Sequence, residues 1–377
     1  MQRPAYEVAQ IIEQFGEQFN REYQPNSFAL RTLEVIRKCR TSELGGHADK
    51  CDCCEKVRIS YNSCKNRHCP KCQAIKQVFW VEDRLERALE VKHFHIVFTF
   101  PDKLNEICLL DSKWFYNLLF SCVWDTLRSF GYSHYGVESG AICVLHTWGQ
   151  TLNFHPHIHC IVPSAGVTLK GNAKLISKKG KYLYPVKMVS AVFRGKMLER
   201  IKKHLRKINQ LKDYHQLLNQ LWIKPWNVHC EAPLGNSEQI VKYLGQYTHR
   251  IAISNQRIQS INKSDVDFSY KDYSNQSKKK IIKLSGVEFL RRFCMHILPK
   301  RFVKIRYYGI YSSKSKSLLA KTKKLKPKET NQQRILRLTG FDIFQCPFCK
   351  KGRMMVIEIL PKIRGPSNPL YKNKMYN

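Results

Sequence analysis

Apolar residues recur at every third or fourth position in several stretches of the chain, and this spacing predicts amphipathic helices. In the first stretch Val8, Ile11 and Phe15 fall on one face. Helices are predicted at residues 5–22, 27–39, 73–90, 113–130, 189–221, 236–250 and 287–298. The sequence Asn236-Ser-Glu provides an amino-terminal cap for the helix that begins there.

Other segments have the composition of β-strands. Residues 93–100 are rich in β-formers and end at a proline, and residues 141–148 and 157–162 are two more predicted strands around a polar turn. Residues 251–273 predict a strand pair, and the lysine- and glycine-rich residues 168–187 predict a basic hairpin or loop. Strands that interleave with helices, without glycine-rich phosphate loops, predict an α+β fold.

The charge of the chain points to a polyanionic partner. In 377 residues, 65 lysines and arginines stand against 29 acidic residues, a formal net charge of +36. A field of this sign attracts nucleic acid first. An anionic membrane surface would require a basic amphipathic helix or a lipidation signal, and the sequence shows neither. The polar amino terminus and the lack of a long apolar run predict a cytoplasmic protein without a membrane partner.

The cysteines are clustered in a way that predicts zinc. Seven of the fifteen lie between Cys39 and Cys72, mostly in C-x-x-C pairs, which in a reducing compartment are typical of metal ligands. One structural zinc is predicted at Cys51, Cys54, Cys69 and Cys72, whose two pairs are 14 residues apart. A second zinc is predicted at Cys39, His47, Cys64 and His68. The spacing leaves open which four ligands share an ion.

Two further features of the cysteine-rich block leave alternatives open. Basic side chains, including Arg67, surround the pairs, so the module is either a DNA-docking surface or a purely structural staple. The carboxyl-terminal pair Cys346 and Cys349 has no obvious partner pair, and is either half of a metal site or two ordinary cysteines.

A His-x-His pair on a predicted strand offers a second kind of metal site. His157 and His159 are two residues apart and therefore project from the same face of a strand. Two imidazoles at this spacing can chelate one divalent ion and leave positions open for oxygen ligands. Gln150, across the preceding turn, is the predicted third ligand. His93 and His95 have the same spacing, and His95 is a second candidate facing that site.

Tyr243 and Tyr247 are four residues apart on a predicted helix and therefore share one helix face. By itself this arrangement is typical of packing. Together with His157-Ile-His159 it resembles the HUH nucleases, in which a histidine-hydrophobic-histidine motif binds the metal and a helix-borne tyrosine attacks a phosphodiester. The Tyr-x-x-x-Tyr spacing resembles their two-tyrosine branch.

Further blocks of sequence follow one another in order over about residues 25–310. They are Cys39-Arg-Thr, Leu44-Gly-Gly-His47, Tyr61-Asn-Ser-Cys64, Arg67-His-Cys-Pro-Lys-Cys72, Phe94-His-Ile-Val-Phe-Thr99, His146-Thr-Trp-Gly-Gln150, His155-Pro-His-Ile-His159 and Tyr243-Leu-Gly-Gln-Tyr-Thr-His-Arg-Ile-Ala-Ile-Ser254, followed by Arg291-Arg-Phe293 and Leu298-Pro299. With these blocks the chain resembles one family, the bacterial rolling-circle insertion-sequence transposases of the family-ninety-one type.

The resemblance implies an amino-terminal helical and zinc-binding module followed by an HUH endonuclease domain, an antiparallel sheet flanked by helices. It implies cleavage and rejoining of single-stranded or hairpin DNA at the ends of the element, through a 5′-phosphotyrosine. Tyr243 and Tyr247 are the implied nucleophiles, and His157 and His159 the implied ligands of a catalytic Mg²⁺ or Mn²⁺. The predicted domains are residues 1–90, 91–310 and 311–377, the last a basic tail.

Phosphate contacts are predicted at Arg67, Arg250, Arg257 and Arg306, although basic side chains of this kind are usually only solvated. Two other functions remain open. A replication initiator or relaxase uses the same chemistry, but the zinc module ahead of the histidine strand favours a transposase. A non-catalytic zinc DNA-binding protein would have no need of both histidines and both tyrosines.

Overall fold

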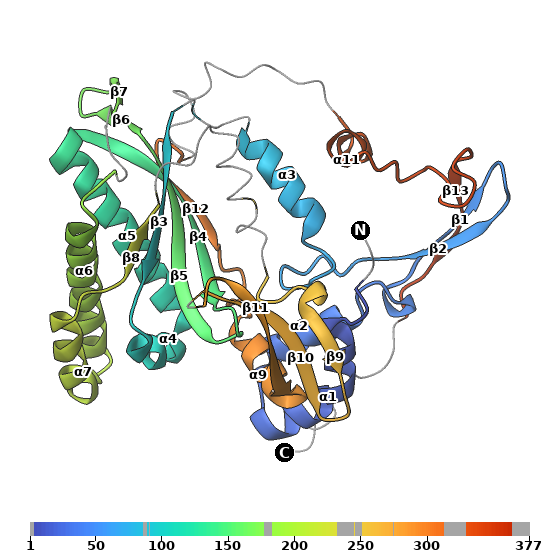
Figure 1. Ribbon diagram of the computed structural model, residues 1–377, viewed down its shortest axis with the longest axis horizontal. Coiled ribbons are helices and arrows are strands. Elements are labelled where there is room, and N and C mark those ends of the chain that lie inside the picture. Colours follow the sequence, from blue (N-terminus) through green and yellow to red (C-terminus); the bar gives the residue numbers. More distant parts are fainter. Residues whose placement is uncertain are drawn as a thin grey trace.

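The computed structural model describes residues 4–85, 89, 91–176, 183–231, 245, 251–273, 275–312 and 329–363. The fold combines antiparallel sheets with helices, which confirms the predicted α+β class (Figure 1). Short 3-10 helices lie at Ser42–Leu44, Asp102–Leu104 and Asn255–Arg257. No described helix is long and apolar enough to cross a membrane.

The largest sheet occupies the middle of the chain and has the strand order β7-β6-β4-β5-β3-β8, with β12 also paired to β4. Its strands are β3 (His93–Thr99), β4 (Val137–Trp148), β5 (Phe154–Pro163), β6 (Ala165–Thr168), β7 (Ala173–Leu175), β8 (Val228–Cys230) and β12 (Ile305–Gly309). All of the pairs are antiparallel. Successive side chains of β5 therefore point alternately to two different layers.

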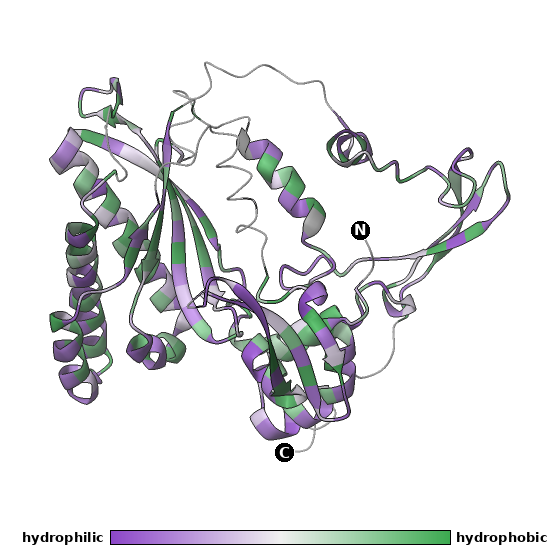
Figure 2. Cartoon of the chain, viewed as in Figure 1, coloured by the Kyte–Doolittle hydropathy of each residue, from purple (hydrophilic) through white to green (hydrophobic). Residues whose placement is uncertain are grey.

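One layer is the main hydrophobic core, which helices cover. These helices are α4 (Asn105–Leu110), α5 (Ser112–Tyr135), α6 (Val186–Lys207) and α7 (Leu211–Ile223). Hydrophobic and hydrophilic residues alternate around α6 and α7, as their partial burial requires (Figure 2). The single helix predicted at 189–221 is two helices, because Asn209 adopts a left-handed φ of 57° and ends α6.

On the opposite face of the sheet lies α3 (Ala74–Leu85). Its Trp80 ring packs against the side chains of Ile142, Val144 and Ile161. The Trp80 indole also donates a hydrogen bond of 3.1 Å to the Tyr307 hydroxyl on β12. The sheet is thus covered on both faces, by the helices of the core on one and by α3 on the other.

A second core joins the amino-terminal helices to a segment much later in the chain. Helices α1 (Val8–Tyr23) and α2 (Ser27–Arg37) pack with α9 (Gly286–Met295) and with a sheet of order β11-β10-β9. The strands of this sheet are β9 (Ile258–Ile261), β10 (Asp265–Asp272) and β11 (Lys278–Ser285). Strands β9 and β10 are the strand pair predicted within residues 251–273, whereas β11 was not predicted. These contacts join residues from the predicted domains 1–90 and 91–310.

The carboxyl-terminal part returns to the amino-terminal module. Helix α11 (Asn331–Thr339) docks on α3 through Arg334, whose guanidinium lies 2.6 Å from Glu82. Strand β13 (Met354–Leu360) then pairs with β1 (Gly46–Cys51), which also pairs with β2 (Val57–Tyr61). Within the tail predicted at 311–377, residues 313–328 and 364–377 lie outside the described residues.

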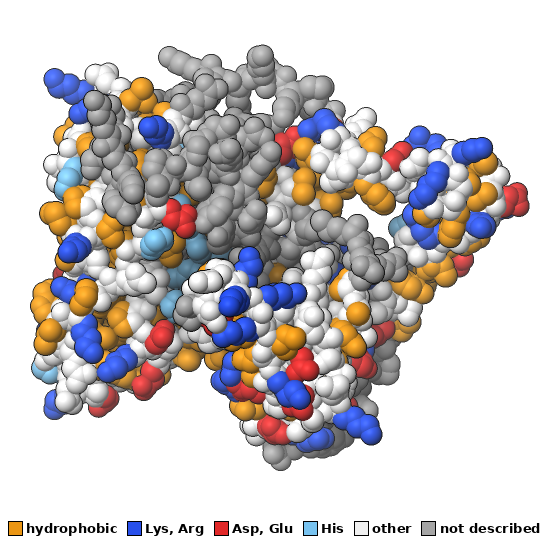
Figure 3. Space-filling view, in the orientation of Figure 1, with side chains coloured by type: hydrophobic (Ala, Val, Ile, Leu, Met, Phe, Trp, Pro, Cys, Tyr) orange, Lys and Arg blue, Asp and Glu red, His pale blue; other side chains and the backbone are white. Residues whose placement is uncertain are grey.

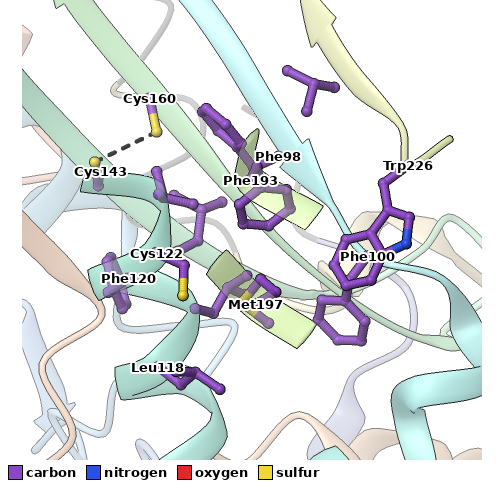
Figure 4. Packing of buried hydrophobic residues seen from close by; sticks show 14 of the residues in the cluster. Phe98, Phe100, Leu118, Phe120, Cys122, Cys143, Cys160, Phe193, Met197 and Trp226 are labelled. Carbon is purple, nitrogen blue, oxygen red and sulfur yellow. Dashed lines mark hydrogen bonds between the residues drawn. The ribbon is translucent and has the colours of Figure 1, made fainter. Parts of the chain in front are cut away.

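The centre of the main core supplies a test of its packing. The Phe193 ring on α6 meets Phe98 of β3 edge-on, with centroids 5.1 Å apart, and both rings are fully buried (Figure 4). We expect Phe193→Ala to lower the free energy of unfolding by about 3–5 kcal/mol, because a cavity of aromatic size would remain. Denaturant unfolding measures this change. The neighbouring Val192→Ala is the control. It is 36% exposed and should change the free energy by no more than about 0.5 kcal/mol.

Candidate metal centres and active site

The first cysteine cluster lies where α2 meets the loop before α3. Its ligand atoms, all within 4.8 Å of one another, belong to Cys39, Cys64, Cys69 and Cys72. The sulfurs of Cys39 and Cys72 are 3.5 Å apart and those of Cys64 and Cys72 are 3.7 Å apart. A tetrahedral zinc with Zn–S bonds of about 2.3 Å would space its sulfurs by about 3.8 Å. The Cys64 backbone N–H also donates to the Cys39 sulfur, which favours its thiolate form.

The second cluster joins the β1–β2 hairpin to the carboxyl-terminal segment before β13. It consists of Cys51, Cys54, Cys346 and Cys349. The Cys51–Cys349 and Cys54–Cys346 sulfur distances are both 3.7 Å. Backbone N–H donation from Gly352 and Lys351 lowers the pKa of Cys349 to about 6, so this thiol ionises readily. A side chain at Gly352 would bring its Cβ within 2.5 Å of the Cys51 sulfur, which explains why glycine stands there.

The structure corrects the predicted grouping of the cysteines. Cys51 and Cys54 do not meet Cys69 and Cys72, because they lie at the far end of the β1–β2 hairpin. There the pairing of β13 with β1 brings up the carboxyl-terminal pair. Cys346 and Cys349, for which the sequence offered no partner, supply the missing half of that cluster.

The two histidines predicted as zinc ligands lie outside both clusters. The His47 ring is 3.5 Å from the Asp49 carboxylate and is partly exposed. Burial lowers the pKa of His68 to about 3, and the cations Lys304 and Arg67 add to this effect. Four thiols complete each cluster without an imidazole, so both sites have the soft donor set that selects zinc.

A cluster of three histidines lies on the face of the sheet that α3 covers. The ring nitrogens of His146, His157 and His159 are within 4.8 Å of one another. Adjacent strands β4 and β5 pair His146 directly with His157, so the two side chains project from the same face. The Nε2 atoms of His157 and His159 are 3.0 Å apart. Histidine side chains gather near the centre of the face in Figure 3, next to lysine or arginine side chains.

The protonation of His157 suits a metal ligand. Its Nδ1 lies 2.7 Å from the His155 carbonyl oxygen, to which it donates, so the Nε2 lone pair faces the other histidines. Burial lowers the pKa of His157 to about 4, which keeps the ring neutral at physiological pH. Three imidazole ligands would leave coordination positions open on a divalent ion.

His146 was not predicted as a member of this cluster. The register of the hairpin was the signal that could have identified it, because a turn centred near residues 150–152 places residue 146 opposite residue 157. The predicted third ligand, Gln150, has other contacts: its amide group donates to the Tyr273 hydroxyl at 3.2 Å. Its Oε1 lies 3.5 Å from the Lys271 backbone nitrogen. His146 is therefore the better candidate for the third ligand.

Two further side chains, His95 and Glu231, lie next to the cluster and orient the His159 ring. The His95 Nε2 lies 2.9 Å from the His159 Nδ1, and the His95 Nδ1 lies 2.9 Å from a Glu231 carboxylate oxygen. If Glu231 accepts a hydrogen from His95, and His95 accepts one from His159, the His159 Nε2 carries the free lone pair. Carboxylate–histidine chains of this kind raise the basicity of a metal ligand. His95, ranked second among the sequence candidates, thus supports the cluster.

The predicted nucleophiles Tyr243 and Tyr247 lie outside the described residues, as does Arg250. Between the two tyrosines Gly245 is described; it is buried and lies against Val81 of α3. A Cβ at position 245 would come within 2.1 Å of a Val81 methyl group, so a side chain there would displace α3. The helix that carries Val81 is the one that packs Trp80 on the histidine-bearing face of the sheet.

Three arginines predicted to bind phosphate make contacts within the protein. Arg67 donates to the Phe302 carbonyl at 2.6 Å, and Arg257 donates to the Ser269 carbonyl at 2.7 Å. The Arg306 guanidinium lies over the Phe120 ring, 4.2 Å from its centroid, and donates to Asn117. Phosphate binding by these arginines stays a prediction.

Comparisons with known proteins agree with this combination of a cysteine module and a histidine-bearing sheet. Residues 11–100 match the family described as "Transposase zinc-binding domain", and residues 140–318 match the family described as "Putative transposase". Zinc-binding transposases are therefore the class of protein to which the fold and the site correspond.

Two curated relatives support the same class. "Putative transposase y4qJ" of Sinorhizobium fredii is 38% identical, over 97% of this chain and 98% of its own length. The "Transposase for insertion sequence element IS801" of Pseudomonas savastanoi pv. phaseolicola is 28% identical, over 76% of this chain and 70% of its own length. No solved structure matches. The chain belongs to the IS91-type transposase family.

The carboxyl-terminal cysteine pair gives a direct test of the second cluster. We expect Cys346→Ser with Cys349→Ser to reduce the zinc content from two ions per chain to one, because two thiolates are lost from one four-thiolate site. Metal analysis of the purified full-length protein measures the content. Cys53→Ser is the matched control, since Cys53 is exposed and outside both clusters, and should leave two ions. Loss of both ions in the double variant would show that the clusters are not independent.

Metal binding tests the role of the contacts from Glu231 to His95 and from His95 to His159. We expect His95→Ala and Glu231→Gln each to weaken binding of Mn²⁺ to the histidine cluster by about 10–100-fold, because the ligand loses its orienting partner. Mn²⁺ titration followed by electron paramagnetic resonance measures the affinity. His155→Ala is the control, because it keeps the backbone carbonyl that His157 uses. Equal affinities in all of the variants would contradict the supporting role.

Proposed function

We propose that the protein is a transposase that cleaves and rejoins single-stranded DNA at the ends of an insertion sequence through a 5′-phosphotyrosine intermediate. The observation that carries the proposal is the cluster of His146, His157 and His159 on the face of the sheet against which α3 packs. The family membership supplies the class of reaction. The motif Tyr243-x-x-x-Tyr247 supplies the candidate nucleophiles.

Histidine nitrogens together with oxygen atoms of the DNA and water would form the mixed donor set for the Mg²⁺ or Mn²⁺ implied for this reaction. His157 and His159, with His146 as the third candidate, would hold the ion and leave its remaining positions to oxygen atoms of the DNA and water. When bound, the ion polarises the scissile phosphate and stabilises the negative charge on its oxygens. Burial keeps the His157 ring neutral, and the contact with His95 fixes the orientation of the His159 ring.

A tyrosine of the pair performs the covalent step. Its phenol, with an ordinary pKa near 10, must lose its proton before its oxygen can attack the phosphorus. The new tyrosine–phosphorus bond forms as the bond from phosphorus to the 3′-oxygen breaks, and that oxygen takes up a proton to become a 3′-hydroxyl. The energy of the broken bond is conserved in the phosphotyrosine, so rejoining needs no ATP.

The position of Gly245 supports the assignment of the tyrosines. It is two residues from each of them, and it lies against α3, the helix that packs on the histidine-bearing face. Two tyrosines would allow the protein to hold two DNA strands at once, as strand transfer requires. The net charge of +36 supports DNA as the partner, with single-stranded or hairpin ends as the preferred form.

Replacement of the tyrosines tests the covalent chemistry. We expect Tyr243→Phe and Tyr247→Phe each to retain part of the covalent DNA adduct, and the double variant to form none, because phenylalanine keeps the ring and removes only the nucleophilic oxygen. The readout is the labelled protein–DNA adduct on a denaturing gel after incubation with single-stranded DNA from the element ends and Mn²⁺. Tyr23→Phe, an exposed tyrosine on α1, is the matched control and should react normally.

Removal of the histidine ligands completes this test. His157→Ala should abolish the adduct and leave two zinc ions per chain, because the imidazole site and the thiolate clusters are separate. An adduct that persists in the double tyrosine variant would overturn the nucleophile assignment. Undiminished cleavage by His157→Ala would overturn the role of the histidine cluster.

A further inference from the structure

A cavity of about 550 Å³ lies between the first cysteine cluster and the central sheet. The loop around the cluster forms one wall, α3 contributes Lys76, and the segment between α9 and β12 closes the other side. We call this cavity the knuckle pocket and define it by Lys65, Arg67, His68, Lys76, Arg301 and Lys304. Its volume is within the range of about 300–1,000 Å³ typical of pockets that bind small organic groups.

The described lining of the knuckle pocket carries five basic side chains and no acidic one. Elsewhere in the described chain basic residues are often neutralised by carboxylates, as Arg37 and Arg334 are. In the pocket, by contrast, Arg67 donates to the Phe302 carbonyl, and the Lys76 ammonium donates to the Lys65 carbonyl at 2.9 Å. Carbonyl groups satisfy hydrogen bonds but do not cancel charge, so this concave surface attracts an anion.

His68 adds a second, independent indication. Its Nε2 atom is buried and has no hydrogen-bond partner among the described residues. A buried polar atom without a partner is uncommon in a folded protein and calls for a ligand or water. An imidazole ring carries its hydrogen on Nε2 in one of its two neutral tautomers, and this atom then has an N–H to donate. Such an N–H would donate to an oxygen atom in the pocket.

The knuckle pocket also borders the candidate active site. A smaller cavity shares Arg67, His68 and Lys304 with it and extends to Trp148 and Ile251. The Trp148 ring stacks on His146, with centroids 4.7 Å apart. Ile251 follows the segment that carries the two tyrosines. Two cavities with shared lining residues therefore lie between the first cysteine cluster and Trp148, whose ring stacks on His146.

We propose that the knuckle pocket binds a backbone phosphate, with its attached nucleotide, of the DNA strand at a position away from the cleaved bond. Lys76 and Arg301 would contact the phosphate from the open side, and His68 would donate from within. The inference rests on the proposed function for the identity of the anion. A phosphate bound there would link the zinc module to the position of the strand at the histidine cluster.

The burial of Lys304 is consistent with an anionic ligand. Burial and the nearby Arg67 guanidinium lower the pKa of Lys304 to about 7. A phosphate in the pocket would favour the charged ammonium, because an opposite charge close to a buried amine raises its pKa. The pocket is thus arranged so that binding of an anion relieves repulsion among its own cations.

The test is the affinity of the full-length, zinc-loaded protein for a fluorescent single-stranded oligonucleotide without added Mg²⁺ or Mn²⁺. We expect Lys76→Gln with Arg301→Gln to raise the Kd by at least about tenfold, because both charge-assisted contacts to the phosphate are lost. The slope of log affinity against log salt should become shallower by about 0.7 for that phosphate. Both side chains are exposed at the mouth of the pocket, so the fold should be unaffected.

The matched control is Lys203→Gln with Arg206→Gln, which removes the same charge from exposed positions on α6, across the sheet from α3. It should change the Kd by less than twofold. Photo-crosslinking with an oligonucleotide that carries 4-thiothymidine should label peptides 65–76 or 298–305 in the native protein. Equal Kd values for the two double variants, or crosslinks confined to other peptides, would overturn the proposal.

Two further arms separate the sources of phosphate and the two proposals. If inorganic phosphate or thymidine monophosphate binds in the pocket while the pocket variant keeps full oligonucleotide affinity, the ligand is a free anion and the DNA assignment is overturned. If the protein crosslinks DNA in the pocket but forms no tyrosine adduct, the proposed tyrosine chemistry is wrong and the proposed DNA-binding pocket is supported. If the pocket variant forms a normal tyrosine adduct and binds DNA as tightly as the control variant, only the proposed DNA-binding pocket is wrong.

Discussion

The antiparallel pairing of β5 with its neighbours β4 and β3 determines where the chemistry can lie. Side chains alternate between faces, so His157 and His159 point to one layer while Ile158 and Cys160 enter the main core. The same register brings His146 beside His157 from β4. A shift of one residue in either pair would bury the imidazoles in the hydrophobic core and expose apolar side chains in their place. The hydrophobic core of α5 and α6 thus holds the histidine cluster in register.

The two cysteine clusters have different consequences for the chain. The first closes a local loop between α2 and α3, next to the knuckle pocket, whereas the second ties Cys51 and Cys54 to residues almost three hundred positions later. The pairing of β13 with β1 and the ion pairs between α11 and α3 also hold the carboxyl-terminal segment against the amino-terminal module. A metal in the second cluster would therefore stabilise the return of the carboxyl-terminal segment, because unfolding must open a very long loop.

Helix α3 contacts three parts of the protein that lie far apart in the sequence. Trp80 packs on the histidine-bearing face of the sheet, Val81 contacts Gly245 between the two candidate tyrosines, and Lys76 lines the knuckle pocket. A small movement of α3 would therefore affect the lining of the knuckle pocket and the contact with Gly245 together.

The sequence by itself determined the features that depend on local spacing. The helical and strand periodicities predicted α1, α2, β3, β4 and β5. The C-x-x-C and His-x-His motifs identified most of the side chains in the three candidate metal clusters. Local spacing cannot tell which distant pairs meet. Only the tertiary structure decided that Cys346 and Cys349 complete the cluster of Cys51, through β13, and that His146 joins His157, through the hairpin register. Such partners depend on strand pairing across long stretches of chain, which the period of one segment does not encode.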